Sequence, residues 1–256
     1  MFNMISAELY KLRKSKSFWN MLGVVAGIAI FVSVVFGVVS GEDVAEIRPE
    51  SASMMFMNGL SLHVQTILFF LVGSTVVFIN SDFDSGTIRN PLAVGISRTN
   101  YFISKFVAIL ITCFAFAIVV ILATSLPYLL FESWGNMFNL SNFLANFGLG
   151  YLILVAQATL FMTVGLVTRK IGATLGIVLG YLVFDMMASA FIGLLEIEGI
   201  IRSVANMLPS PAGMYLENLS LGTADFGNVM MVVVVSVGLI VVASVLSVGS
   251  LIRKDI

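Results

Sequence analysis

The chain has 256 residues, of which 59% are hydrophobic and only 11% are charged. A soluble domain typically has about 25% charged residues, and a single core of this size cannot bury so much apolar side chain. The composition therefore excludes an ordinary soluble protein and predicts an all-α membrane protein. The net charge of −1 gives no further guidance, because the charges are segregated along the chain.

Residues 1–17 precede the first long apolar run and have the pattern of a short amphipathic helix. Apolar side chains recur every three or four residues, at Phe2, Ile5, Leu9 and Leu12. The other faces carry Glu8, Lys11, Arg13 and Lys14. This spacing predicts an interfacial helix that lies on the inner leaflet of the membrane. The alternative is a simple basic anchor for the first span. A cleaved signal peptide is disfavoured, because the apolar run that follows is too long.

Residues 18–256 form the predicted transmembrane domain, which contains six apolar stretches. A helix needs about 20 such residues to cross a bilayer. The six stretches are Phe18–Ser40, Leu60–Asn80, Tyr101–Leu130, Phe143–Thr168, Ile171–Leu194 and Phe226–Ile252. We expect Pro127 to kink or end the third of them, because proline disrupts a helix interior.

The distribution of basic residues predicts the orientation of these spans. Eleven of the 13 Lys and Arg residues fall on one predicted side, at positions 11, 13, 14, 16, 89, 98, 105, 169, 170, 253 and 254. Only Arg48 and Arg202 fall on the other side. Because cytoplasmic loops are enriched in Lys and Arg, both termini are expected in the cytoplasm and the protein in the cell membrane.

Residues 196–225 form a broken segment before the last span. The segment is moderately apolar, but Pro209, Pro211 and Gly213 interrupt it. Its backbone polar groups would be costly in lipid unless protein or water satisfied them. It is predicted to be a re-entrant hairpin that dips in from the outer side, and the alternative is an external loop.

Two spans carry glycines at helix-contact spacing. Gly23 and Gly27 are four residues apart in the first span, and Gly172, Gly176 and Gly180 repeat this step in the fifth. Small residues at this spacing allow helix backbones to approach closely. They predict a seam between two subunits, and the alternative is packing within the chain.

Asp185 lies near the middle of the fifth span. A carboxylate at that depth is costly, so its side chain should face protein or a water-filled cavity. One interpretation is a polar point on a substrate path. The other is a hydrogen bond or a protonated acid at a helix interface, and the sequence favours neither.

The patterns of most catalytic and metal sites are absent from the sequence. It has no phosphate-binding P-loop, no H-E-x-x-H, no C-x-x-C and no G-x-S-x-G. His63 and Cys113 are single residues, and each is better explained as an interfacial or buried side chain. The chain is therefore predicted to have no metal, no cofactor of its own and no nucleic-acid partner.

Residues 82–105 form a compact polar segment between the second and third apolar stretches. Ser85 and Gly86 permit a turn, and 87–94 can form a short helix across the cytoplasmic face. Gly95 and Ser97 then break this helix before the third span begins. The alternative is an ordinary basic loop.

The order of residues in this segment resembles the first cytoplasmic loop of type-2 ABC transporter permeases. There, an acid, G-T-x-R, S-R and a lysine accompany a coupling helix that docks on the ATPase subunit. The matching residues here are Asp84, Gly86, Thr87, Arg89, Ser97, Arg98 and Lys105. Asp82 or Asp84 stands in place of the usual glutamate, and Pro91 lies earlier than the usual proline. The N-terminal helix, the six spans and the broken segment also resemble this family.

The resemblance implies the function and the partners. The chain would be the permease subunit of an ATP-driven bacterial exporter that moves an amphipathic or hydrophobic peptide, lipid or drug. A second permease and two ATPase subunits would complete the complex, with ATP and Mg²⁺ on the ATPase chains. Small permeases of this kind often export antimicrobial peptides or give immunity to them. The alternatives are an intramembrane enzyme and a non-transporting scaffold or sensor subunit.

Overall fold

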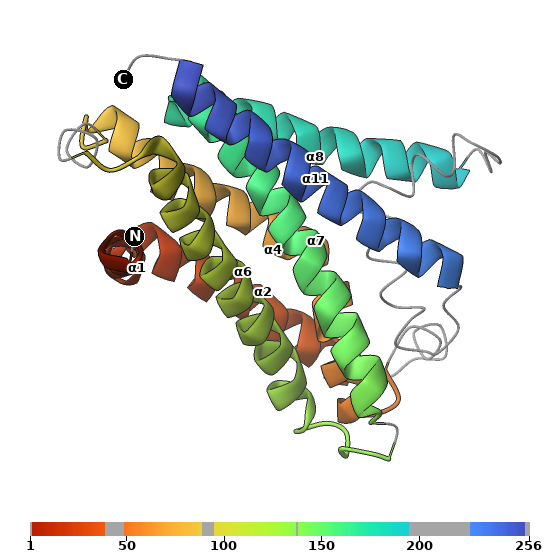
Figure 1. Ribbon diagram of the computed structural model, residues 1–256. Helices are drawn as coiled ribbons and strands as arrows, with labels where there is room; N and C mark the ends of the chain where they lie inside the picture. Colours follow the sequence, from red (N-terminus) through yellow and green to blue (C-terminus); the bar gives the residue numbers. More distant parts are fainter. Residues whose placement is uncertain (1, 39–48, 89–94, 137, 195–225, 254–256) are drawn as a thin grey trace.

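The computed structural model describes residues 2–38, 49–88, 95–136, 138–194 and 226–253 (Figure 1). Within these ranges every regular element is a helix. The helices are α1 (Phe2–Lys14), α2 (Lys16–Val38), α4 (Ala52–Asp84), α6 (Arg98–Tyr128), α7 (Leu140–Thr168), α8 (Ile171–Leu194) and α11 (Phe226–Arg253). The predicted re-entrant hairpin at 196–225 lies outside the described residues, as does most of the predicted helix at 87–94.

Six of the helices, all but α1, are long and apolar enough to cross a membrane. This confirms the predicted all-helical membrane architecture with six spans. The largest difference from the predicted boundaries is in α4, which begins at Ala52 and not at Leu60. Ser51 caps this earlier start, because its side chain accepts a hydrogen bond from the Met54 amide at 3.3 Å. Pro127 lies in the last turn of α6, which ends at Tyr128 as expected.

Two helices form the interior of the bundle. α4 packs against α2, α6, α7 and α8, while α7 also packs against α11. Most of the apolar stretch of α4 and of α7 is buried, whereas less than a quarter is buried in α2, α8 and α11. The outer helices therefore expose large apolar side chains such as Phe31, Phe184 and Val245. Exposure on this scale suits helices whose surroundings are lipid.

Hydrogen bonds between helices show which helix ends lie together. Near the end of α4, Asn80 donates to Thr174 on the first turn of α8 at 2.5 Å. Thr168, at the end of α7, is hydrogen-bonded to the same Thr174 hydroxyl. The Arg98 guanidinium at the start of α6 donates to the carbonyls of Leu251 and Ile252 at the end of α11. Successive spans therefore run in opposite directions.

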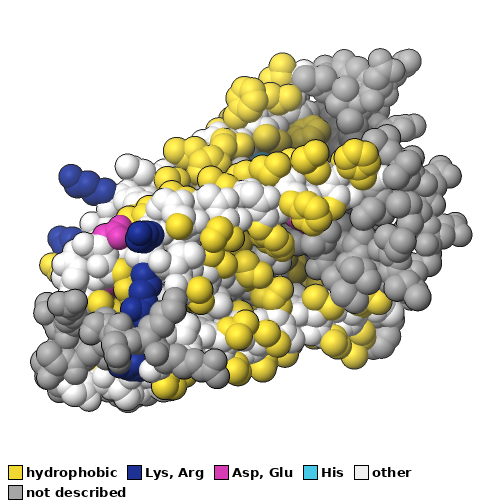
Figure 2. Space-filling view, turned by 90° about the horizontal axis from the view of Figure 1, so that it is seen from above, with side chains coloured by type: hydrophobic (Ala, Val, Ile, Leu, Met, Phe, Trp, Pro, Cys, Tyr) yellow, Lys and Arg dark blue, Asp and Glu magenta, His cyan; other side chains and the backbone are white. Residues whose placement is uncertain are grey.

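We call this end of the bundle the basic end, because the described Lys and Arg side chains gather there. They are Lys11, Arg13, Lys14, Lys16, Arg98, Lys105, Arg169 and Lys170. Figure 2 shows dark blue Lys and Arg side chains at one end of the molecule and yellow hydrophobic side chains scattered over the rest of the visible described surface. The N-terminal helix and the end of α11 lie at the same end (Figure 1).

Candidate functional site

The polar connection from α4 to α6 begins with an exposed turn. Asp84, Gly86 and Thr87 are all exposed. Gly86 has φ +67°, a left-handed conformation that glycine adopts without a steric penalty. The Ile88 amide donates to the Asp82 carbonyl at 3.1 Å, and the Ile88 side chain is buried. The predicted turn at Ser85–Gly86 is therefore present. The end of α4 holds it on one side, and Ile88 holds it on the other.

The far side of the same connection leads directly into α6. Gly95 has φ +86°, and Ser97 caps the helix by accepting a hydrogen bond from the Asn100 amide at 3.2 Å. Arg98 then turns toward the last carbonyls of α11, which no amide within that helix can satisfy. Arg89 lies outside the described residues, so its predicted contact to an ATPase stays a prediction.

Directly beneath the exposed turn lies a cluster of four charged side chains, three of which are buried. Lys105 of α6 is fully buried, and its Nζ lies 2.7 Å from a carboxylate oxygen of Glu8 and 2.7 Å from one of Asp82. Lys11 of α1 lies 3.0 Å from Glu8 and 3.2 Å from Asp82. Two cations and two carboxylates therefore bridge α1, α4 and α6 at the start of the connection. We call these four residues the ion-pair cluster.

Neutral groups supply further hydrogen bonds to the charged atoms of the ion-pair cluster. The Tyr101 hydroxyl donates to Asp82 at 3.1 Å, and Lys105 donates to the Phe78 carbonyl at 3.3 Å. The Lys105 ammonium also lies 4.1 Å from the centre of the Phe78 ring, a cation–π distance. Burying charges is tolerable only when they are paired and hydrogen-bonded in this way.

Lys11 is the member of the cluster that reaches the surface, with 48% of its side chain exposed. Partial burial by itself would lower its pKa, but the carboxylates of Glu8 and Asp82 outweigh this effect and raise the pKa above the usual value. Lys11 therefore stays charged at neutral pH and keeps the cluster electrically balanced.

Sequence reasoning placed Glu8 on a polar face of the N-terminal helix, and this was wrong. Met4, Glu8 and Leu12 are all buried, and α1 packs against α6 through this face. The sequence signal for this was the four-residue spacing of these side chains, which places them on one face of a helix. Glu8 breaks the apolar pattern, and its partner Lys105 lies 97 positions away in the sequence, so the pairing could not be read locally.

The structure separates the predicted coupling residues into two groups. Asp84, Gly86, Thr87 and Ser97 are exposed, so they are available to a partner. Lys105 is fully buried and therefore cannot touch a partner directly. Asp82, not Asp84, is the acid that pairs with it. Tyr101, which sequence reasoning missed, holds the same carboxylate.

The predicted seam glycines point away from the rest of the described chain. A methyl group built on Gly23, Gly27, Gly172, Gly176 or Gly180 would meet no described atom within 4 Å. All five glycines are exposed. Among the described residues, these five glycines therefore do not pack against another helix of the same chain, as the alternative interpretation would require.

Asp185 is fully buried, although α8 is mostly exposed. One turn earlier, the Tyr181 hydroxyl donates to Gln157 of α7 at 3.1 Å. Polar side chains therefore mark the contact between α7 and α8 at membrane depth. A part in a substrate path stays a prediction.

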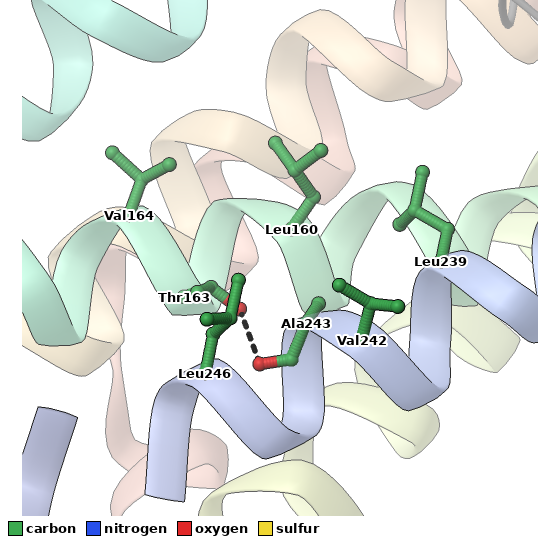
Figure 3. A pocket seen from close by; sticks show the side chains of 7 residues that line it. All are labelled: Leu160, Thr163, Val164, Leu239, Val242, Ala243 and Leu246. Atoms are coloured by element: carbon green, nitrogen blue, oxygen red, sulfur yellow. Dashed lines mark hydrogen bonds between the residues drawn. The ribbon is translucent and has the colours of Figure 1, made fainter. Parts of the chain in front are cut away.

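An apolar groove of about 330 Å³ opens between α7 and α11 (Figure 3). Six aliphatic side chains line it, from Leu160, Val164, Leu239, Val242, Ala243 and Leu246. The one polar lining residue, Thr163, donates to the Ala243 carbonyl at 3.0 Å and is hydrogen-bonded to Ser247. The groove thus offers a hydrocarbon surface with its polar atoms already satisfied.

Comparison with known proteins decides the family. A family model described as "ABC-2 family transporter protein" matches residues 4–187, which is more than two thirds of the chain. The chain belongs to the ABC-2 transporter family. No curated protein matches it. The match spans α1, the polar connection and most of α8, so the ion-pair cluster lies within the part of this ABC-2 permease that carries the family likeness.

Proposed function

We propose that this ABC-2 permease is the membrane subunit of an ATP-driven exporter powered by separate ATPase subunits. The sequence contains no P-loop, so an energised transporter would need ATP and Mg²⁺ on another chain. The proposed complex contains two permease subunits, identical or homologous, and two ATPase subunits. Both termini and the basic end lie in the cytoplasm, in accord with the bias of basic residues.

One observation carries the proposal. The exposed turn Asp84–Thr87 lies directly on the ion-pair cluster that joins α1, α4 and α6. A force applied to this turn by an ATPase would therefore act on three helices together and not on a loose loop. Close packing within a helix bundle favours such rigid-body displacement over continuous deformation. In this proposal, ATP-driven closure of the ATPase pair moves these helices and opens an outward path.

The surface of the bundle supports an amphipathic or hydrophobic substrate. The groove between α7 and α11 is lined by aliphatic side chains, and its hydroxyl is already paired. A peptide, lipid or drug with an apolar part fits this chemistry. Antimicrobial peptides are one such class, and the sensitivity of a deletion strain to a panel of peptides, lipids and drugs would identify the substrate.

The ATPase partnership can be tested by affinity purification from the native cells in mild detergent. Wild-type permease should retain an ABC ATPase, and the Gly86→Val/Arg89→Glu double variant should lose most of it. The matched control is Lys170→Glu, which reverses an exposed charge at the basic end outside the α4–α6 connection. Equal retention by both variants would contradict docking at this connection.

The same preparation separates the alternatives. A stable permease that retains no ATPase would favour a scaffold or sensor subunit. Retained ATPase whose hydrolysis rate responds to an amphipathic substrate would support the exporter, and turnover of a substrate without any ATPase would indicate an intramembrane enzyme.

A further inference from the structure

A second hollow of about 510 Å³ lies at the basic end, between α1, the first turn of α2 and the end of α4. Lys11, Lys14 and Lys16 line it together with three serines, and Val77 and Phe78 supply an apolar side. We call it the lysine groove. It lies beside the ion-pair cluster and shares Lys11 with it. Its volume is within the range of small-molecule sites.

Two of the three charges of the groove are not neutralised by the described chain. Neither Lys14 nor Lys16 has a carboxylate within ion-pair distance among the described residues, and both are exposed. Lys11, by contrast, donates to Glu8 and to both carboxylate oxygens of Asp82, so its three N–H groups already have partners in the ion-pair cluster. Two ammonium groups, those of Lys14 and Lys16, can therefore direct hydrogen bonds to one anion in the groove.

The position of the groove identifies the kind of anion. It opens where α1 ends and α2 begins, around Ser15, and beside the last two turns of α4. Tyr10 and Trp19, which flank this junction, are 64% and 55% exposed, as aromatic residues at a membrane–water boundary commonly are. A ligand here meets charged groups on the aqueous side and an apolar wall on the lipid side.

We propose that the lysine groove binds the phosphate headgroup of an anionic phospholipid. The phosphate accepts hydrogen bonds from Lys14 and Lys16, while the glycerol and the first acyl carbons lie against Val77. Because Lys14 belongs to α1 and Val77 to α4, a bound lipid would fix α1 against α4. The proposal needs α1 to lie at the membrane boundary, and it is independent of the substrate and of the ATPase.

Binding can be measured on the purified full-length permease by native mass spectrometry during a titration with phosphatidylglycerol. The test variant is Lys14→Gln/Lys16→Gln. The control is Arg13→Gln/Lys170→Gln, which removes the same charge from exposed positions that do not line the groove. Each basic residue near an anionic lipid surface contributes about fivefold. We expect the test variant to need at least about tenfold more lipid for half-saturation, and the control less than about twofold more.

Three outcomes would overturn the proposal. Equal losses in the two double variants would mean diffuse attraction to surface charge. Equally tight binding of phosphatidylcholine by the wild type would mean that the net negative charge of the lipid is not recognised. Displacement of the lipid by millimolar glycerol phosphate would identify a site for a soluble phosphate. Both double variants must fold and elute like the wild type. We expect this because all four substituted side chains are exposed.

Discussion

At the scale of single residues, the decisive feature is a fully buried lysine. Lys105 lies 2.7 Å from each of two carboxylates that reach it from different helices. Replacing such a buried network by apolar residues can be neutral, but removing one member leaves charge without compensation. Lys105 is therefore more important for holding α1, α4 and α6 together than any exposed residue of the polar connection.

Lys105→Met should destabilise the protein strongly. Glu8 and Asp82 would then share only Lys11, so one buried negative charge would be left uncompensated, which costs about 3–5 kcal/mol. Unfolding of the purified protein in detergent measures this loss. Adding Glu8→Gln restores the charge balance and should recover part of the stability. Lys170→Met, at an exposed position, should change it by less than about 0.5 kcal/mol. A small effect of Lys105→Met alone would contradict the role assigned to the cluster.

At the scale of helices, the interior depends on how closely α4 approaches its neighbours. A methyl group built on Gly59 of α4 would lie 2.7 Å from the Thr124 hydroxyl and 3.3 Å from the Ile121 backbone of α6. Both distances are shorter than ordinary contact, and the second atom belongs to the main chain. Gly59 therefore allows the close packing of α4 on α6, as small residues do between membrane helices.

Gly59→Ala should push α4 and α6 apart and destabilise the protein by about 1–3 kcal/mol, the usual cost of overpacking. The matched control is Gly148→Ala on α7, where the added methyl group meets no described atom within 4 Å. This change should be neutral or stabilising by up to about 1 kcal/mol, because alanine favours the helix. Thermal unfolding of the two variants side by side provides the comparison, and equal effects would refute the close contact.

At the scale of the whole molecule, two helix faces remain without partners in the described chain. The glycines of α2 and α8 have open space around them, although glycine-rich faces in membranes usually pack against another helix. A second permease subunit would supply that helix. The proposed dimer therefore uses surfaces that the described part of one subunit leaves uncovered.

Cysteine cross-linking in native membranes tests the seam. Gly176→Cys or Gly27→Cys should form a cross-linked pair of permease subunits under mild oxidation, because close backbone approach brings two such positions together. Leu122→Cys, on an exposed part of α6, should not. If Leu122→Cys formed the cross-link and neither glycine variant did, the interface between subunits would lie elsewhere.

The sequence by itself determined the number of spans, their alternating direction and the side on which the basic residues gather. These properties follow from local quantities: the length of apolar runs, the turn chemistry of Ser85–Gly86 and the positions of Lys and Arg. The tertiary structure alone decided which charged residues are internal. Glu8, Asp82 and Lys105 come from three separate helices, and a buried ion pair leaves no local pattern in any of them. The polar connection therefore divides into an exposed turn that a partner can reach and a buried lysine that holds the helices beneath it.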